Sequence, residues 1–416
     1  MLGLMQDWPL LVHKVLDHAA IYAGDKEIVS RGVEGPMRRT NWRTIHERSR
    51  RLAKALTRRG VKTGDRLATL AWNSERHLES WYGITGAGGV YHTLNPRLFP
   101  EQLVYIANHA EDRAIFVDLT FVPILEKLQD QLKTVESYVV LTDAAHMPQT
   151  SLRNAVAYEE LLKEADADFE WVSLEENAAC GLCYTSGTTG NPKGVLYSHR
   201  SNVLHAMAIL SADGFALSNA DTVLPIVPMF HANAWSLSFS APMTGAKMVM
   251  PGAKLDGPSV YELLETEQVT MSAAVPTVWL MLLQHMEAND LKLSSLKRVA
   301  IGGSACPPSM IQKFEQNLAR QLCKGLPLKK NETLKAKEYE QMTRSDDGYF
   351  KDFFNVLEDK PNKGQLALPP SEDRRAEMLA LPPSRHDERR PNLNNDRLIQ
   401  NERLALTNGP DRRPID

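Results

Sequence analysis

The chain has 416 residues, 43% of them hydrophobic, so it is long enough for two or three domains and can supply a sizeable core. Its 48 lysines and arginines nearly balance 51 acidic residues, which leaves a net charge of -3. Such a chain has no strong positive field to attract nucleic acid or an anionic membrane surface. We therefore expect no nucleic-acid partner.

Cysteine usage and hydropathy bear on the cellular compartment. The four cysteines, Cys180, Cys183, Cys306 and Cys323, are too few and too scattered for a disulfide framework, which is typical of a reducing compartment. The N-terminus lacks a basic leader followed by an apolar run, and no stretch of about 18 or more apolar residues occurs. These features predict a cytoplasmic protein without a membrane span.

From about residue 40, predicted helices alternate with short apolar strands. Apolar residues recur at helical spacing over 40–59, and glycines follow. Ser74 is a candidate helix cap. Strands are predicted at 66–72, 88–94, 114–118 and 137–142, with helices from Ser74, near Pro100 and around 122–132. Repeated alternation of this kind predicts a parallel or mixed α/β sheet.

A second α/β run follows a glycine-rich segment at 184–195. It contains predicted helices at 201–210 and 259–267 and apolar segments at 222–231, 246–252, 272–286 and 296–305. We therefore expect an α/β fold in residues 1–315, with subregions at about 40–175 and 176–315.

The character of the chain changes after about Phe314. Helical spacing continues until Gly325 and Pro327, and residues 316–360 are predicted to be a helical extension of unknown role. Residues 361–416 contain no aromatic residue and many charges of both signs. Because they cannot bury enough apolar surface to offset conformational entropy, we predict a disordered tail there.

The segment YTSGTTGNPKGV, at 184–195, has the composition of a phosphate-binding loop. Its glycines let successive backbone N–H groups point into one concavity, and its hydroxyls and Lys193 offer further donors to phosphate oxygens. It does not match a P-loop, because Gly187 and Gly190 are three residues apart and the lysine precedes a glycine. The composition predicts a polyphosphate site but disfavours a P-loop ATPase or kinase.

Residue for residue, this segment resembles the signature of the adenylate-forming (AMP-binding) superfamily, which includes acyl-CoA synthetases, luciferases and peptide-synthetase adenylation domains. PMFHANAW, at 228–235, resembles the next motif of that family in the form typical of its fatty acyl branch. AIGGSACP, at 300–307, resembles its adenine-side loop. The resemblance covers about residues 5–315. It implies a medium- or long-chain fatty acyl-CoA synthetase with the stacked αβα subdomains of the family's N-terminal part.

The resemblance also implies roles for individual residues. His231 and Lys193 are the candidate catalytic residues, with His231 positioning the carboxylate, and Trp235 would line or gate an acyl tunnel. Thr185 is in addition the candidate ligand of Mg²⁺. The candidate nucleotide-binding residues are Thr185, Ser186, Gly187, Thr188, Thr189, Gly190, Lys193, Gly302, Gly303 and Ser304.

Other readings of these and neighbouring residues are structural. A lone histidine is usually a satisfied core residue, and Trp235 could equally be core packing. We interpret Cys180 and Cys183 as buried small residues, because no second pair lies at metal-ligand spacing. His199 is interpreted as a helix-start contact. The basic residues between Arg48 and Arg59 are interpreted as the solvated face of a helix.

The resemblance implies two half-reactions that use fatty acid, ATP, coenzyme A and Mg²⁺, and related synthetases suggest a homodimer. After Phe314, however, the metal-binding tyrosine-glycine-x-threonine-glutamate motif, the ribose-binding threonine-glycine-aspartate motif and the C-terminal domain are not found. Three interpretations stay open: a synthetase crippled by these losses, a non-catalytic nucleotide- or acyl-binding remnant, and a chimeric product of a wrongly joined reading frame.

Overall fold

The computed structural model describes residues 5, 8–185 and 191–322, and the side chains of the last helix as far as 316. These residues all belong to the first of two compact units, residues 1–367. The predicted tail at 361–416 and most of the predicted extension at 316–360 lie outside the described residues.

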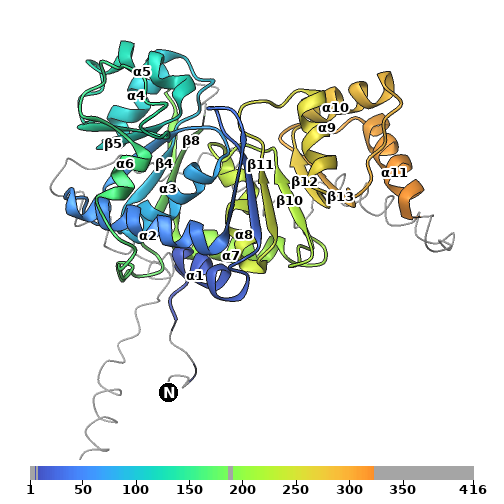
Figure 1. Ribbon diagram of the computed structural model, residues 1–416, viewed down its shortest axis with the longest axis horizontal. Helices are drawn as coiled ribbons and strands as arrows, with labels where there is room; N and C mark the ends of the chain where they lie inside the picture. Colours follow the sequence, from blue (N-terminus) through green and yellow to red (C-terminus); the bar gives the residue numbers. More distant parts are fainter. Residues whose placement is uncertain (1–4, 6–7, 186–190, 323–416) are drawn as a thin grey trace, which may run out of the picture. The chain divides into compact units, whose positions relative to one another are not determined.

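One sheet has seven strands in the order β7-β6-β5-β3-β4-β8-β9 (Figure 1). Its strands are β3 (Arg66–Leu70), β4 (Val90–Thr93), β5 (Ala114–Val117), β6 (Ser137–Val140), β7 (Ala155–Ala157), β8 (Ala179–Thr185) and β9 (Lys193–Ser198). All neighbouring pairs are parallel except β8 and β9, which form an antiparallel hairpin at one edge. Every residue of β4 and β5 is buried, as expected for parallel strands covered on both faces.

The other sheet has six strands in the order β13-β12-β10-β11-β1-β2. Its strands are β1 (Glu27–Arg31), β2 (Met37–Asn41), β10 (Thr222–Pro225), β11 (Lys247–Met250), β12 (Met271–Ala274) and β13 (Arg298–Ile301). Only the edge pair of β1 and β2 is antiparallel among these described strands. Neither sheet follows chain order, because the N-terminal hairpin joins the later strands and β8–β9 joins the earlier ones.

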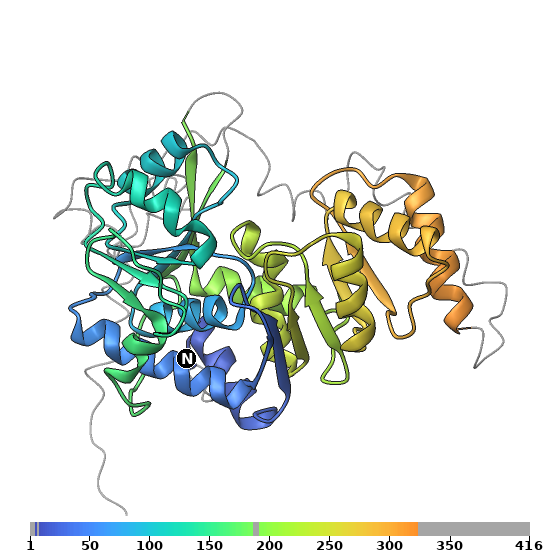
Figure 2. The ribbon, with the colours of Figure 1, turned by 45° about the horizontal axis from the view of Figure 1, so that its top comes forward.

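Helices cover both faces of each sheet (Figures 1 and 2). One group packs in the shared core cluster between the sheets: α1 (Val12–Tyr22), α2 (Trp42–Arg58), α3 (Glu75–Gly86), α6 (Tyr158–Lys163), α7 (His199–Ile209) and α8 (Leu237–Thr244). The seven-stranded sheet carries α4 (Pro100–Ala110) and α5 (Val122–Leu128) on its other face. The six-stranded sheet carries α9 (Gly257–Thr266), α10 (Pro276–Ala288) and α11 (Pro308–Leu322). The predicted stacked αβα fold is thus confirmed for the described residues, none of whose helices is long and apolar enough to cross a membrane.

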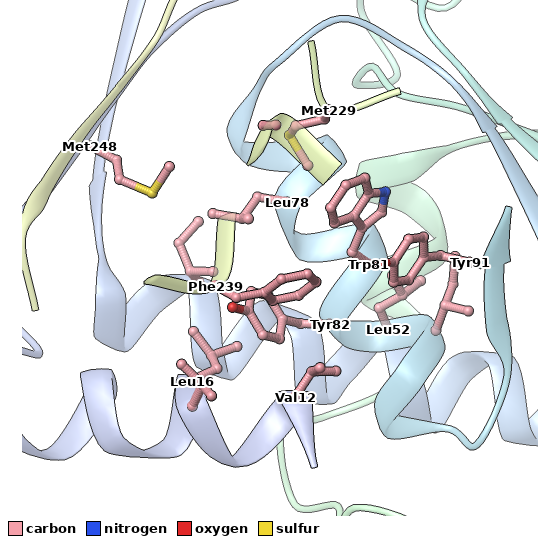
Figure 3. Close-up of a cluster of buried hydrophobic side chains, with 14 of the residues drawn as sticks. Val12, Leu16, Leu52, Leu78, Trp81, Tyr82, Tyr91, Met229, Phe239 and Met248 are labelled. Atoms are coloured by element: carbon pink, nitrogen blue, oxygen red, sulfur yellow. The ribbon is translucent and has the colours of Figure 1, made fainter. Parts of the chain in front are cut away.

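The shared core joins the two sheets around α3 (Figure 3). The Trp81 indole stacks on Tyr91 of β4 with ring centroids 4.3 Å apart, and Phe239 of α8 lies 5.9 Å from Trp81. Burying one large apolar side chain contributes about 1.5–3 kcal/mol. The side chains labelled in this cluster are Val12, Leu16, Leu52, Leu78, Trp81, Tyr82, Tyr91, Met229, Phe239 and Met248.

Element boundaries show which local signals were informative. Ser74 caps α3 as predicted, since its Oγ accepts from the His77 N–H at 3.2 Å. The strand predicted at 66–72 ends earlier, at Leu70. The β1–β2 hairpin was not predicted, because β2 reads Met-Arg-Arg-Thr-Asn and lacks an alternating apolar pattern.

The basic face of α2 is not simply solvated, which corrects the interpretation of Arg48. Its guanidinium donates to Glu79 of α3 at 2.8 Å and to both oxygens of Glu159 of α6 at 2.9 Å. Arg76 donates to the same Glu159 at 2.9 Å and to Glu34 at 2.5 Å. Burial opposes the ionisation of Glu159, but its hydrogen bond and charge attraction with Arg48 lower its pKa to about 2. The interpretation failed because these carboxylates come from segments far along the chain.

Candidate active site

A cavity of about 190 Å³ lies where the carboxyl ends of strands from both sheets meet. Residues that follow β3 and β4 line one side, and residues that follow β10, β11 and β12 line the other. Ligands of open α/β sheets bind at this end of the strands. The lining residues are Trp72, Asn73, Asn95, Arg97, Ile226, Val227, Pro228, Phe230, His231, Pro251, Gly252, Leu255, Val275 and Val278.

The segment predicted to bind phosphate, 184–195, begins in β8 and ends in β9. Thr185, the last residue of β8, pairs with Lys193, the first residue of β9, and the Thr185 hydroxyl lies 3.5 Å from the Lys193 carbonyl. Ser186, Gly187, Thr188, Thr189 and Gly190 lie outside the described residues. Lys193 is exposed, and its ammonium makes no ion pair or hydrogen bond with any described residue.

Aromatic and acidic side chains support the strand end behind this loop. The hydroxyl of Tyr184 hydrogen-bonds His109 Nδ1 at 2.6 Å, and its ring lies 5.2 Å from that of His92. His92 Nδ1 in turn contacts both oxygens of the buried Asp112 at 2.9 Å. The first residue of the loop is thus held by two histidines from the β4 and α4 segments.

His231 and Trp235 lie on opposite ends of an unusual turn after β10. His231 is exposed at the wall of the cavity, and partial burial of the ring lowers its pKa, so the neutral imidazole is favoured. Trp235 packs against Gly302, where an added Cβ would come within 2.8 Å of the indole Cη2. In this structure the aromatic ring that packs on Gly302 is therefore the indole of Trp235, a side chain of the protein itself.

The rest of the predicted adenine-side loop is open. β13 ends at Ile301, and Gly303 and Ser304 follow it at the surface. Gly303 adopts φ +79, a left-handed conformation that favours glycine. These two positions remain accessible to a planar ligand, whereas the face of Gly302 is occupied by Trp235.

The described residues do not by themselves make a metal centre. They contain no group of three or more histidine, cysteine, aspartate or glutamate side chains placed to hold a metal ion. Thr185, the predicted Mg²⁺ ligand, offers a single hydroxyl. Mg²⁺ usually binds one or two carboxylates together with substrate phosphates, so we derive no reaction step through this ion.

Three polar residues of the cavity were missed from the sequence. Asn73, Asn95 and Arg97 each follow the end of a predicted strand, and this position was the available signal. Arg97 is exposed, and its guanidinium has no partner among the described residues. Asn73 instead joins the sheets: its Nδ2 donates to the carbonyls of Pro225, the last residue of β10, at 2.8 Å and of Val227 at 2.9 Å, and its Oδ1 accepts from the Met229 N–H at 2.7 Å.

The structural interpretations of the cysteines and His199 are confirmed. Cys180 and Cys183 are buried in β8, and burial raises their pKa values to about 12 and about 11, so both stay protonated thiols. His199 begins α7, and its Nδ1 accepts from the Val12 N–H at 3.2 Å. Burial lowers the pKa of His199 to about 3. These groups support the fold and do not reach the cavity.

Comparison with known proteins extends this description. The family model described as "AMP-binding enzyme" matches residues 16–326. The chain is 50% identical over 316 residues to a 3-methylmercaptopropionyl-CoA ligase of Ruegeria lacuscaerulensis, covering 76% of this chain and 59% of that protein. It is 47% identical to a medium-chain-fatty-acid–CoA ligase of Ectopseudomonas oleovorans (76% and 58% covered) and to a long-chain-fatty-acid–CoA ligase of Thermus thermophilus (75% and 56%). The chain thus spans less than two thirds of the length of these relatives.

Solved structures share the fold at lower sequence identity. The anthranilate CoA ligase AuaEII in complex with anthranoyl-AMP superposes with a TM-score of 0.67 at 22% identity, covering 75% of this chain and 59% of that one. The N-terminal domain of FACL13 from Mycobacterium tuberculosis gives a TM-score of 0.63 at 24% identity, with 74% and 73% covered. At these identities the likeness concerns the fold alone.

Proposed function

Because the chain belongs to the AMP-binding enzyme family, we propose that it activates a medium- or long-chain fatty acid with ATP, first to the acyl-adenylate and then to acyl-CoA. One observation carries this proposal. The strand ends that bear the Lys193 loop, His231 and the Gly302 loop belong to one family-matched region, and His231 lines a largely apolar cavity between two sheets.

The first half-reaction needs a carboxylate oxygen to bond to the α-phosphorus of ATP while the bond to pyrophosphate breaks. Such transfers depend mainly on positioning and on stabilisation of charge. Lys193 has no competing partner among the described residues and would bind the departing pyrophosphate. His231, neutral at physiological pH, would orient the carboxylate by a hydrogen bond.

In the second half-reaction the sulfur of coenzyme A bonds to the acyl carbon and its thiol proton passes to water, while AMP leaves with the electrons of the acyl–oxygen bond. The exposed Arg97 at the cavity wall offers a positive charge to an anionic group of either large substrate. When bound, Mg²⁺ would neutralise charge on the phosphates. The apolar lining near Phe230, Leu255 and Val278 suits an uncharged chain.

The choice of acyl chain is the finer part of the proposal. Two relatives of equal identity are named for medium-chain and long-chain fatty acids, and another for 3-methylmercaptopropionate. Parallel assays with octanoate, palmitate and 3-(methylthio)propanoate would rank these classes. We expect octanoate or palmitate to be preferred.

The test is pyrophosphate exchange into ATP that depends on the fatty acid, measured for the full chain and for Lys193→Ala. An exchange rate of the full chain well above that of Lys193→Ala supports the proposed synthetase activity. An exchange rate no higher than that of Lys193→Ala would refute this activity. ATP-dependent thermal stabilisation without exchange would instead favour a second candidate, a nucleotide-binding protein that does not turn over.

A further inference from the structure

The turn between His231 and α8 has an unusual backbone. Its residues, η2 (Ala232–Ser236), are five consecutive non-glycine residues with φ between 46 and 64. Left-handed conformations are costly for residues with a Cβ, and runs of them persist only where surrounding contacts enforce them. Something in the structure must therefore hold this turn.

The side chain of Asn233 makes the contacts that can do so. Asn233 is buried, with an exposed fraction of 4%. Its Nδ2 donates to Oδ1 of Asn202 at 3.2 Å, and its Oδ1 accepts from Sγ of Cys183 at 3.7 Å. Asparagine also tolerates the left-handed region better than most residues.

Asn202 anchors this contact to the body of the protein. It lies on α7 with an exposed fraction of 2%. Its Nδ2 reaches the Tyr91 hydroxyl of β4 and Sγ of Cys180 of β8, both at 3.2 Å. Both amides are thus fully enclosed, and a buried polar chain runs from β4 and β8 through α7 to the turn.

This chain connects the two halves of the candidate site. Cys183 lies two residues before Thr185, where β8 ends and the phosphate loop begins. Asn233 lies between His231, which lines the cavity, and Trp235, which packs on Gly302. A buried hydrogen-bonded network in a low-dielectric interior is rigid when all its members are satisfied.

We infer that Asn233 and Asn202 are positioning residues, a buried amide pair that holds the left-handed turn and so places His231 relative to the strand that carries the phosphate loop. Neither residue needs to touch substrate. The inference rests on the proposed adenylation in its functional part, and on the turn alone in its structural part.

Asn233→Gly tests the inference directly. Glycine adopts the left-handed conformation without a Cβ penalty, so the substitution removes the amide contacts and leaves the backbone free to keep its path. Asn154→Gly is the matched control, because Asn154 also has φ +50 and its Nδ2 donates to the Glu136 carbonyl at 2.9 Å, away from the cavity. Asn202→Ala and the double variant Asn233→Gly/Asn202→Ala complete a double-mutant cycle, which measures how strongly the two residues are coupled.

The structural readout is hydrogen–deuterium exchange of peptides that cover residues 229–240 in the full chain. We expect faster exchange there in Asn233→Gly and Asn202→Ala, and wild-type exchange in Asn154→Gly. Unchanged exchange in both site variants would overturn the inference, whether or not the protein binds any substrate.

The functional readout is affinity for a hydrolysis-resistant octanoyl-adenylate analogue compared with affinity for ATP. Loss of positioning should weaken the analogue about tenfold, leave ATP within about twofold, and give a double variant no worse than either single one. A general loss of stability would weaken both ligands alike and would contradict a positioning role. If the wild type binds neither ligand, the proposed function fails while the exchange experiment still decides the structural part.

Discussion

Two charged regions of the molecule differ in whether their basic side chains are paired with carboxylates. We call them the paired region, around α2 and α3, and the open region, at the strand ends. Around α2 and α3, Arg48 and Arg76 are largely buried and donate to carboxylates of α3, of α6 and of the segment between β1 and β2. At the strand ends, Lys193 and Arg97 are exposed and find no partner among the described residues. The first arrangement stabilises the fold, and we propose that the second offers positive charge to a ligand. Charge alone therefore does not identify a site, since Arg48 and Arg76 are charged but are paired with carboxylates of the fold.

The largest expected effect is a loss of folding stability when an ion pair of the paired region is broken. Arg48→Ala leaves the buried Glu79 with only the Tyr158 hydroxyl as a partner, and the partly exposed Glu159 keeps Arg76. Breaking a fully buried pair costs about 3–5 kcal/mol, and because both carboxylates keep a partner we expect a loss of about 3 kcal/mol. Urea unfolding followed by circular dichroism would measure this loss. Arg51→Ala on the exposed side of the same helix is the control and should stay within about 0.5 kcal/mol of wild type. Equal losses in both variants would mean that pairing is not what matters.

A substitution in the open region, at the strand ends, should lower activity and leave folding stability unchanged. Lys193→Ala removes an exposed ammonium that contacts no partner within 8–185 and 191–322, so the melting temperature should hardly change. Removal of one group that stabilises transition-state charge costs about 10²–10³-fold in rate, and we expect a fall of this size in pyrophosphate exchange. Lys292→Ala, an exposed lysine elsewhere, should leave exchange intact. A loss of stability in Lys193→Ala without a loss of exchange would reverse the comparison.

A smaller effect on stability is expected at the contact between Trp235 and Gly302, which lies at the strand ends with Lys193 and Arg97. Gly302→Ala places a methyl group within 2.8 Å of the indole, so the ring must move, and overpacking of this kind costs about 1–3 kcal/mol. Thermal unfolding and binding of the acyl-adenylate analogue would both report the change. In a Trp235→Ala background the same glycine substitution should be nearly neutral. An equal penalty in both backgrounds would show that the clash is not its cause.

Sequence and structure agree where local signals carry the information. The strand–helix alternation depends on neighbouring residues, and the fold class follows from it. The amide pair of Asn202 and Asn233 joins residues 31 apart, and the ion pair of Arg48 and Glu159 joins residues 111 apart. No periodic pattern marks such contacts, because each partner is an ordinary polar residue in its own segment. The hydrogen bonds of Asn73, which join residues 152 and 154 apart, are hidden for the same reason, although its place after a predicted strand was a signal for the cavity.

The smallest expected effect concerns Asp118, a buried acid beside the paired region. Burial raises its pKa to about 7, although its carboxylate accepts the Trp72 N–H at 2.7 Å. The neighbouring charges act in both directions: Glu75 and Glu34 raise this pKa, and Arg76 lowers it. Because the folded pKa lies above the unfolded value of about 3.9, the native state binds the extra proton between these values. Stability contributed by this group is therefore fully present below about pH 4 and is lost as pH rises through about 7.

Asp118→Asn imitates the protonated acid and should remove this pH dependence. At pH 8 we expect the variant to be more stable than wild type by about 1–2 kcal/mol, and at pH 5 the two should differ little. Urea unfolding at both pH values measures the difference. The asparagine Oδ1 can still accept from Trp72, so the wall of the cavity keeps its hydrogen bond. A variant less stable than wild type at pH 8 would show that the carboxylate is held by attraction to Arg76, which would place Asp118 among the paired charges of the interior.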